Sequence, residues 1–269
     1  FAVEVHEGPL PMPAEKWHAA LQDFDAIAPT VIDRLPPAAF QAEGRRTRIL
    51  GNFGVGYNHI DIDAARASGL AVTNTPGVLT DATADQAMGL LLAVARGISL
   101  GDWHVRDGQW TGWNPTDRLG TQVAGKTLGI IGCGNIGSIV ADRAQGLKMK
   151  VISFDPFLTP EHARRIGVEK VELDELLATA DVISLHTPLT EQTRNILSAD
   201  ALNKTRAGVR IVNCARGGLV DELALAAALS SGHVAGAALD VFETEPVRES
   251  PLFGMENVIA TPHLGASTT

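Results

Sequence analysis

Residues 127–155 constrain the fold of this chain more than any other part of its sequence. They contain a short apolar run, a turn with the spacing G-x-G-x-x-G, a helical pattern and a second apolar run. The three glycines are Gly132, Gly134 and Gly137. The first allows a tight turn, the second lets the backbone approach a pyrophosphate, and the third lets a helix pack closely on a strand. The pattern predicts strand, turn, helix and strand in succession, as in a doubly wound sheet.

An acid follows the second apolar run at a distance typical of a nucleotide site. Asp155 stands 23 residues beyond Gly132, close to the spacing of about 20 expected of a carboxylate that accepts hydrogen bonds from a ribose. Phosphates would lie at the start of the helix, where unpaired N–H groups favour negative charge. A glycine turn with only a structural role is the alternative. Because strand, turn, helix and acid occur in this order, we interpret the segment as a dinucleotide site.

The composition is that of an ordinary globular protein and argues against several classes of function. With 269 residues, 45% of them hydrophobic and 20% charged, the chain suffices for one large or two medium domains. The formal net charge is −9 and basic residues do not form long runs, so we expect no nucleic-acid partner. No apolar run reaches about 18 residues, so we expect no membrane span.

The cysteine content points to a reducing compartment. Cys133 and Cys214 are too few for a disulfide framework, and no Cys and His cluster has the spacing of zinc ligands. We therefore expect a cytoplasmic protein without a metal site. Cys133 lies within the glycine turn, and we interpret it as a small turn residue because no histidine or second cysteine adjoins it.

Both ends of the sequence look interrupted. The chain opens at Phe1, inside an alternating run, and stops at Thr269 just after Gly-Ala-Ser-Thr, which would suit the start of a helix. We expect terminal segments to be missing.

The first part of the chain predicts a small α/β domain of its own. Strand patterns occupy residues 1–6, 26–27, 47–50 and 70–73, and amphipathic segments occupy residues 14–21 and 62–67. The strongest helix pattern covers residues 80–95, with Thr80 or Asp81 as the expected N-cap. We place a substrate domain at residues 1–98 and a dinucleotide-binding domain at residues 99–269.

A tryptophan-rich stretch follows this helix. Trp103, Trp110 and Trp113 lie close together among glycines and a proline, in a segment that resembles a loop. Indoles rarely remain solvated, so they either pack locally or form a contact between subunits, where tryptophan is a frequent anchor.

From residue 127 onward, apolar runs alternate with helical patterns. The runs cover residues 127–132, 151–154, 182–185, 210–213, 235–239 and 258–261, with helical patterns at 172–178 and 221–229. Near-continuous apolar strands interleaved with helices predict a parallel sheet covered on both faces.

Ligands bind such sheets at the carboxyl ends of the strands, so the residues after each run are candidates for a site. Besides the glycine turn and Asp155, these are Pro156, His186, Thr187, Pro188, Cys214, Ala215, Arg216, Gly217, Gly218, Asp240 and His263.

Arg216 follows one predicted strand and precedes two glycines. A guanidinium in this place can take a carboxylate through two parallel hydrogen bonds, which lysine cannot copy. The alternative is a surface salt bridge or a helix cap.

Glu245 and His263 each follow a later predicted strand. A carboxylate beside an imidazole favours the protonated ring, which is a common arrangement for a general acid. Spacing does not show that the two side chains meet, and a histidine at a strand end is often only structural.

The longer motifs resemble the D-isomer-specific 2-hydroxyacid dehydrogenase family. They are GCGNIG with Asp155, HTPLTEQTRNIL, NCARGGLVDE, AGAALDVFETEP and TPHLGAST, which together span most of residues 125–269. The resemblance implies an α/β fold of two domains. One is a Rossmann-type doubly wound parallel sheet, and the other is a smaller flavodoxin-like α/β substrate domain, which we expect to be incomplete at both chain ends.

The family's catalytic residues fall on Arg216, Glu245 and His263. The resemblance implies NAD as cofactor and reversible hydride transfer between the nicotinamide and C2 of a 2-keto or D-2-hydroxy acid. Arg216 would hold the carboxylate, and His263, kept protonated by Glu245, would donate a proton. Asp155 implies NAD over NADP, because a carboxylate there would repel a 2′-phosphate.

The remaining expectations for the site also come from the resemblance. GNFGVGYNHID is similar to the family's substrate loop, which implies that Gly54, Val55 and Gly56 hold the substrate carboxylate. Trp113 corresponds to a tryptophan that in some members reaches the neighbouring subunit's pocket, which implies a homodimer. The expected cofactor-binding residues are Thr80, Gly132, Gly134, Asn135, Ile136, Gly137, Asp155, His186, Thr187, Pro188, Thr193, Cys214, Ala215, Asp240 and Gly265.

Two halves of the chain resemble different branches of the family. Residues 51–125, including QWTGWNP, are most similar to glyoxylate and hydroxypyruvate reductases, whereas the part from residue 147 onward is more similar to D-3-phosphoglycerate dehydrogenases. The substrate loop has Asn52 and Phe53 where phosphoglycerate enzymes carry a basic residue, which favours a small unphosphorylated 2-keto acid.

Three other functions remain as alternatives. A formate dehydrogenase is disfavoured because that branch has glutamine in place of Glu245. An NAD-sensing corepressor of the same fold would bind peptides instead of turning over a substrate. A chain without its terminal segments could also bind NAD and be inactive.

Overall fold

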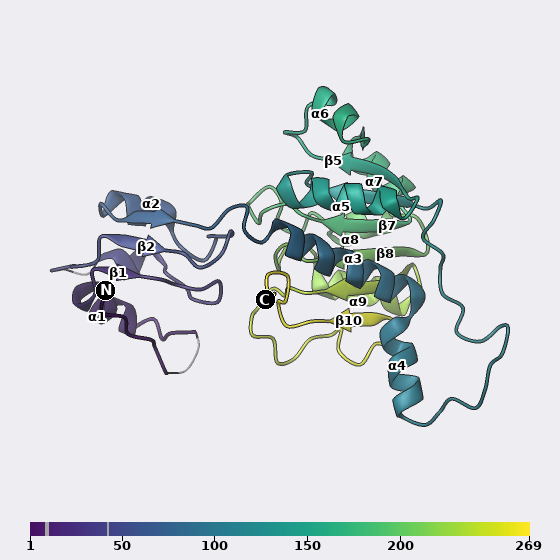
Figure 1. The fold of residues 1–269 in the computed structure, drawn as a ribbon, viewed down its shortest axis with the longest axis horizontal. Helices are drawn as coiled ribbons and strands as arrows, with labels where there is room; N and C mark the ends of the chain where they lie inside the picture. Colours follow the sequence, from purple (N-terminus) through teal and green to yellow (C-terminus); the bar gives the residue numbers. More distant parts are fainter. Residues whose placement is uncertain (9–10, 42) are drawn as a thin grey trace. The chain divides into compact units, whose positions relative to one another are not determined.

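The computed structural model describes residues 1–8, 11–41 and 43–269, which form two compact units, Phe1–Val78 and Leu79–Thr269 (Figure 1). Each unit has its own parallel sheet and its own hydrophobic core. The α/β class predicted from the sequence is therefore confirmed for both.

The first unit is built on three short parallel strands in the order β1-β2-β3. They are β1 (Ala26–Ile27), β2 (Ile49–Gly51) and β3 (Ala71–Thr73), accompanied by α1 (Lys16–Asp23), the 3-10 helix η1 (Pro37–Gln41) and α2 (Ile62–Ala67). Helix α2 begins where it does because the Asp61 carboxylate accepts the Ala64 N–H at 2.8 Å. The core of this unit contains Trp17, Leu21, Leu35, Ala39, Phe40, Leu50, Ile60, Ala65 and Leu70.

The strand predicted at residues 1–6 is wrong. This segment has no regular secondary structure, and Phe1, Val3 and Val5 are exposed. A strand needs a neighbour to satisfy its backbone groups, and no described strand pairs with this segment. An alternation of apolar and polar residues is therefore not sufficient on its own to predict a strand.

The second unit contains a seven-stranded sheet in the order β10-β9-β8-β7-β4-β5-β6, with every pair of neighbours parallel. Its strands are β4 (Thr127–Ile131), β5 (Lys150–Phe154), β6 (Glu169–Lys170), β7 (Val182–Leu185), β8 (Val209–Asn213), β9 (Val234–Leu239) and β10 (Val258–Ala260). The order reverses direction on the two sides of β4, which is the Rossmann-type doubly wound arrangement. The strands predicted from residue 127 onward are confirmed, and only the two-residue β6 was missed.

Helices cover both faces of this sheet (Figure 1). On one face lie α3 (Thr80–Arg96) and α5 (Asn135–Gly146), which pack against each other and share a core with β4, β5, β7 and β8. On the other face lie α7 (Leu173–Thr179), α8 (Ala199–Asn203) and α9 (Glu222–Ser230), over a second core. The short helix α6 (Pro160–Arg165) lies beside β6. Strands buried on both faces explain why the apolar runs are nearly continuous.

By packing, the chain divides between Val78 and Leu79, earlier than the functional boundary at residues 98 and 99 that we predicted. Helix α3 belongs to the second unit because it packs on α5, β8 and β9. The predicted N-cap of this helix is wrong: Leu79 occupies that position and gives no side-chain cap, while Thr80 is the first helical residue.

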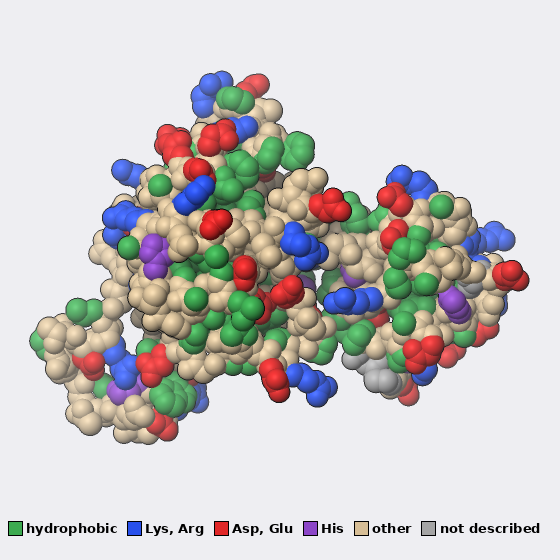
Figure 2. All heavy atoms as spheres, turned by 180° about the vertical axis from the view of Figure 1, so that it is seen from behind, with side chains coloured by type: hydrophobic (Ala, Val, Ile, Leu, Met, Phe, Trp, Pro, Cys, Tyr) green, Lys and Arg blue, Asp and Glu red, His purple; other side chains and the backbone are tan. Residues whose placement is uncertain are grey.

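The tryptophan-rich stretch contains a helix that the sequence did not indicate, α4 (Ile98–Arg106). It buries none of its residues. Trp103, Trp110 and Trp113 are 54%, 61% and 84% exposed, so the alternative of local packing is wrong for these indoles. We call residues 98–119, which include α4 and the three tryptophans, the arm. In Figure 2 hydrophobic side chains lie on the outside of the arm. Acidic and basic side chains are interspersed over the face shown.

Candidate active site

The glycine turn joins β4 to α5 and leaves room beside its second glycine. A Cβ on Gly132 would lie 2.8 Å from the Thr187 nitrogen, and one on Gly137 would lie 2.2 Å from the Gly132 oxygen, so neither position accepts a side chain. A Cβ on Gly134 would meet nothing within 4 Å. The first N–H groups of α5 therefore border open space, which fits a pyrophosphate.

Asp155 is held beside this turn by two backbone groups. One carboxylate oxygen accepts the Cys133 N–H at 2.8 Å, and the other accepts the Phe157 N–H at 2.7 Å. A carboxylate has about four acceptor sites, so lone pairs remain for the hydroxyl groups of a ribose. The acid predicted from its spacing therefore lies at the glycine turn.

The segment after β7 lies against the same turn. The His186 N–H donates to the Ile131 oxygen at 2.8 Å, and its ring Nε2 lies 2.8 Å from the Ser184 hydroxyl. Burial lowers the pKa of His186 to about 4, so this ring is neutral at physiological pH. The Thr193 hydroxyl donates to the Pro188 oxygen at 2.7 Å and thereby shapes the loop that follows.

Arg216 lies on the loop after β8, and that loop is held by a residue that sequence reasoning missed. The side chain of Asn213 accepts the Ala215 N–H at 3.0 Å and donates to the Arg216 oxygen at 2.8 Å. A Cβ on Gly217 would lie 1.8 Å from the Phe242 oxygen, so the loop passes directly against the segment after β9. Burial lowers the pKa of Arg216 and the charge of Glu245 opposes this, but a guanidinium stays charged in proteins.

Glu245 and His263, which the sequence could not join, are in contact. The Nδ1 atom of His263 lies 2.7 Å from one Glu245 carboxylate oxygen, and the other oxygen accepts the Phe242 N–H at 2.9 Å. Burial alone would raise the pKa of Glu245, but the hydrogen bond and charge of His263, the Phe242 N–H and the Arg216 charge outweigh it. The pKa of Glu245 is therefore lowered, and this carboxylate is ionised at neutral pH.

Asp240 holds the turn that carries His263. Its side chain is fully buried and accepts the Thr261 hydroxyl at 2.5 Å and the N–H groups of Leu264 and Gly265 at 2.8 Å each. Its backbone oxygen accepts the His263 N–H at 2.9 Å. These bonds support the left-handed backbone of His263, whose φ is 54°. Sequence reasoning did not identify Thr261.

The predicted substrate loop lies in the first unit, directly after β2. Gly54, Val55 and Gly56 are partly exposed. In the described part of the chain, the N–H groups of Val55 and Gly56 have no hydrogen-bond acceptor. Two backbone donors in sequence are suited to an oxyanion.

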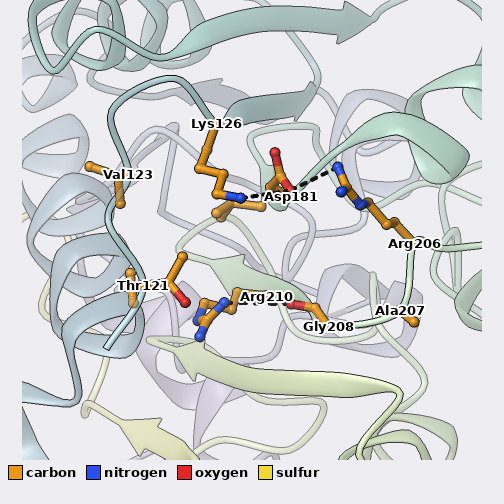
Figure 3. A pocket seen from close by; sticks show the side chains of 10 residues that line it. Thr121, Val123, Lys126, Asp181, Arg206, Ala207, Gly208 and Arg210 are labelled. Atoms are coloured by element: carbon orange, nitrogen blue, oxygen red, sulfur yellow. Dashed lines mark hydrogen bonds and ion pairs between the residues drawn. The ribbon is translucent and has the colours of Figure 1, made fainter. Parts of the chain in front are cut away.

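A cavity of about 190 Å³ lies at the opposite, amino-terminal edge of the second sheet, before β4, β7 and β8. In Figure 3, Lys126 and Arg206 point toward Asp181, at 3.9 and 3.0 Å from its carboxylate, while the Thr127 N–H donates to it at 2.9 Å. These contacts tie the starts of β4 and β7 together, away from the candidate residues.

Within the described ranges, no group of three or more Cys, His, Asp or Glu side chains could hold a metal ion. No helix found there is long and apolar enough to cross a membrane.

Comparisons with known proteins agree with this geometry. Residues 88–265 match the family described as D-isomer specific 2-hydroxyacid dehydrogenase, NAD binding domain. The glyoxylate reductase of Thermococcus litoralis is 41% identical over 272 residues, which cover all of this chain and 82% of that protein. The D-3-phosphoglycerate dehydrogenase of Bacillus subtilis is 48% identical over 248 residues, which cover 92% of this chain. A crystal structure of a Thermus thermophilus protein is similar with a TM-score of 0.90 and 40% identity, over 98% of this chain and 83% of that one.

The chain spans about half the length of the phosphoglycerate dehydrogenases that it matches, 46% of the Bacillus subtilis protein. Its second unit has the doubly wound sheet, the glycine turn and the acid of a nucleotide site, and the family match covers most of that unit. The chain belongs to the D-isomer specific 2-hydroxyacid dehydrogenase family, and its second unit contains the NAD-binding domain.

Proposed function

We propose that this protein transfers a hydride reversibly between NAD and C2 of a small 2-keto or D-2-hydroxy acid. The contact between His263 and Glu245, with Arg216 in electrostatic range, is the observation that carries the proposal. All three residues follow neighbouring parallel strands, at the edge of the sheet that also bears the glycine turn. An acid, an imidazole and a guanidinium at the end of an NAD-binding sheet are suited to reduction of a carbonyl beside a carboxylate.

Each residue has a distinct part in this reaction. Arg216 binds the substrate carboxylate and polarises the carbonyl, while the ring of His263 donates a proton to the developing alkoxide from its Nε2 atom. Glu245 holds Nδ1 and stabilises the charged ring, because its own lowered pKa keeps it anionic. The bound nicotinamide supplies or accepts the hydride. Gly54, Val55 and Gly56 of the first unit are proposed as substrate-binding residues, through the N–H groups of Val55 and Gly56.

The cofactor is proposed to lie along the carboxyl edge of the second sheet. Asn135 and Ile136, the first residues of α5, face its phosphates together with the glycine turn, and Asp155 accepts hydrogen bonds from a ribose. The other proposed contacts come from Thr80, His186, Thr187, Pro188, Thr193, Cys214, Ala215, Asp240 and Gly265. Residues 1–98 act as the substrate domain and residues 99–269 as the dinucleotide-binding domain.

We propose glyoxylate or hydroxypyruvate as the substrate. At the start of the substrate loop stands Asn52, which is buried and carries no charge to attract a phosphate. The 41% identity to a glyoxylate reductase over most of that protein's length is consistent with this choice.

D-3-phosphoglycerate is the second candidate substrate, because the phosphoglycerate dehydrogenase of Bacillus subtilis is 48% identical over its matched region. Steady-state kinetics with NADH over a panel of 2-keto acids, beside oxidation of 3-phosphoglycerate with NAD, distinguishes the two. Glyoxylate and hydroxypyruvate should give the highest kcat/KM. A higher kcat/KM for 3-phosphoglycerate would make it the substrate instead. Absence of turnover on the whole panel would refute both candidate substrates.

A cytoplasmic homodimer is the proposed form of the protein. The arm around α4 exposes Ile98, Trp103, Trp110, Trp113 and Leu119, an apolar surface of the kind that subunit interfaces bury. Trp113 would then border the pocket of the neighbouring subunit. Analytical ultracentrifugation should give a dimer for the wild type and a monomer for Trp103→Glu with Trp110→Glu, whereas a monomeric wild type would refute this part.

A further inference from the structure

We propose that Asn52 and Asn74 are positioning residues that preset the substrate loop for a carboxylate, and that His59 sets the orientation of Asn52. The inference rests on the proposed function, because the carboxylate in question is that of the 2-keto acid. It assigns roles to three residues that do not themselves touch the substrate.

The backbone carbonyls of the loop are all held by donors of the first unit. The Asn52 side-chain nitrogen donates to the oxygens of Gly54 at 3.0 Å and Gly56 at 2.9 Å. The Asn74 side-chain nitrogen donates to the oxygen of Val55 at 2.8 Å. A backbone donor, the Thr75 N–H, adds a second bond to the Gly54 oxygen at 3.1 Å. Three consecutive carbonyls are therefore fixed by two asparagine side chains.

Fixing these carbonyls also fixes the N–H groups. In a trans peptide the C=O of one residue and the N–H of the next point in opposite directions. The N–H groups of Val55, Gly56 and Tyr57 are consequently directed away from the asparagine donors. No acceptor for the first two is found among the described residues. Successive N–H groups held in this way form a concave anion site. Because the loop is already ordered before the ligand binds, binding does not have to offset the entropy lost in ordering it.

The orientation of the Asn52 amide is determined by its surroundings. Its nitrogen lies near two carbonyl oxygens, so its oxygen must be the atom that lies 2.8 Å from Nε2 of His59. That oxygen can only accept, which requires a proton on Nε2 of His59. His59 is itself anchored, because its backbone oxygen accepts the Leu35 N–H at 2.9 Å. Asn52 is 1% exposed, so no water competes for these bonds.

The same contacts limit the class of ligand. Both hydrogens of the Asn52 amide are used on the loop carbonyls, so this side chain has no donor left for a phosphate. What the loop offers is a small set of backbone donors without a side-chain cation, which suits a carboxylate of a short acid.

The first test uses Asn52→Ala and Asn74→Ala in the full chain, with oxamate as an unreactive mimic of a 2-keto acid. Each variant should raise KM for glyoxylate and Ki for oxamate by about tenfold to a hundredfold, the effect of misplacing a binding group by about 1 Å. The value of kcat and the Kd of NADH should change little, because the loop lies outside the NAD-binding unit. Gln22→Ala is the matched control, since its amide also donates to a backbone oxygen, that of Glu43, but at an exposed site of the same unit.

The second test uses His59, which is only partly buried, so that the inference does not depend on a variant of the buried Asn52 folding. His59→Leu removes the donor to Asn52 and should raise KM and Ki in the same direction, while His59→Gln retains an amide donor and should restore most of the loss. Equal values for the leucine and glutamine variants would contradict the positioning role.

The two proposals fail in different ways. A wild type that reduces glyoxylate, with Asn52→Ala and Asn74→Ala folded by thermal melting yet unchanged in KM and Ki, refutes this inference and leaves the proposed function intact. A wild type that neither reduces any 2-keto acid nor binds oxamate refutes the proposed function, and the inference with it.

Discussion

The Nδ1 atom of His263 lies 2.7 Å from a carboxylate oxygen of Glu245, whose other oxygen is held by the Phe242 N–H. Because Nδ1 is engaged, Nε2 is the ring atom left for a substrate. The Glu245 carboxylate therefore lies on the Nδ1 side of the His263 ring, and the Nε2 side is the one available to a substrate.

His263→Ala should abolish most of the reduction of 2-keto acids. General acid catalysis contributes about 10²–10⁴-fold, so kcat should fall by that factor, while the Kd of NADH stays near the wild-type value. Stopped-flow kinetics and fluorescence titration measure the two quantities. His162→Ala is the control, because α6 lies beside β6, at the opposite end of the strand order from β10. Retained turnover would remove His263 from the mechanism.

Glu245→Gln should change how stability depends on pH. The pKa of Glu245 is lowered from an ordinary value of 4.5, so the folded protein favours the carboxylate more than the unfolded chain does. Its contribution to stability is complete above the unfolded value and is lost as the pH falls through the lowered folded value. The difference in Tm between wild type and Glu245→Gln should therefore narrow below about pH 4.5. A difference that is constant from neutral pH into this range would contradict the assignment.

Alanine substitutions at two glycines of the turn should differ in their effects on Tm and on NADH binding. Gly134→Ala places a Cβ in open space, so the protein should fold with an unchanged Tm but bind NADH more weakly, because the methyl group occupies room meant for the cofactor. Gly137→Ala places a Cβ 2.2 Å from the Gly132 oxygen, so its Tm should fall. Differential scanning fluorimetry with and without NADH separates the effects. A destabilised Gly134→Ala would contradict the open space at that position.

Asp155 should determine the choice between NADH and NADPH. The wild type should prefer NADH, and Asp155→Asn, which removes the charge but keeps one acceptor oxygen, should reduce that preference by about tenfold or more, since like-charge repulsion costs several kcal/mol. The ratio of kcat/KM for the two cofactors is the measurement. A wild type that prefers NADPH would reject the role of the carboxylate.

Much of the second unit could be predicted from the sequence because strands buried on both faces leave apolar runs that few other structures produce. The first unit gave weaker signals, since its strands have only two or three residues. Helix α4 was missed because it buries no residue and therefore shows no apolar face toward a core.

Individual residues of the candidate site could be predicted, but their contacts could not. The bonds of Asp240 to Thr261, Leu264 and Gly265 hold the turn that carries His263 to Glu245, and no spacing rule contains that information. Asn213 was missed for a similar reason, because it bonds the backbone of its own loop. Gly217 was among the candidates at the strand ends, but its approach to the Phe242 oxygen joins segments distant in sequence and could not be predicted.

The division of the chain at Val78 assigns the residues of the proposed function to two different units. Asn52, His59 and Asn74 lie with their loop in the first unit, whereas the glycine turn, Arg216, Glu245 and His263 belong to the second. Under the proposed function, acceptance of one acid or another can therefore change through residues of the first unit alone, while the proposed cofactor site and proton donor of the second unit stay the same. A chimera that takes residues 1–78 from a relative of different preference would be a direct route to a new substrate range.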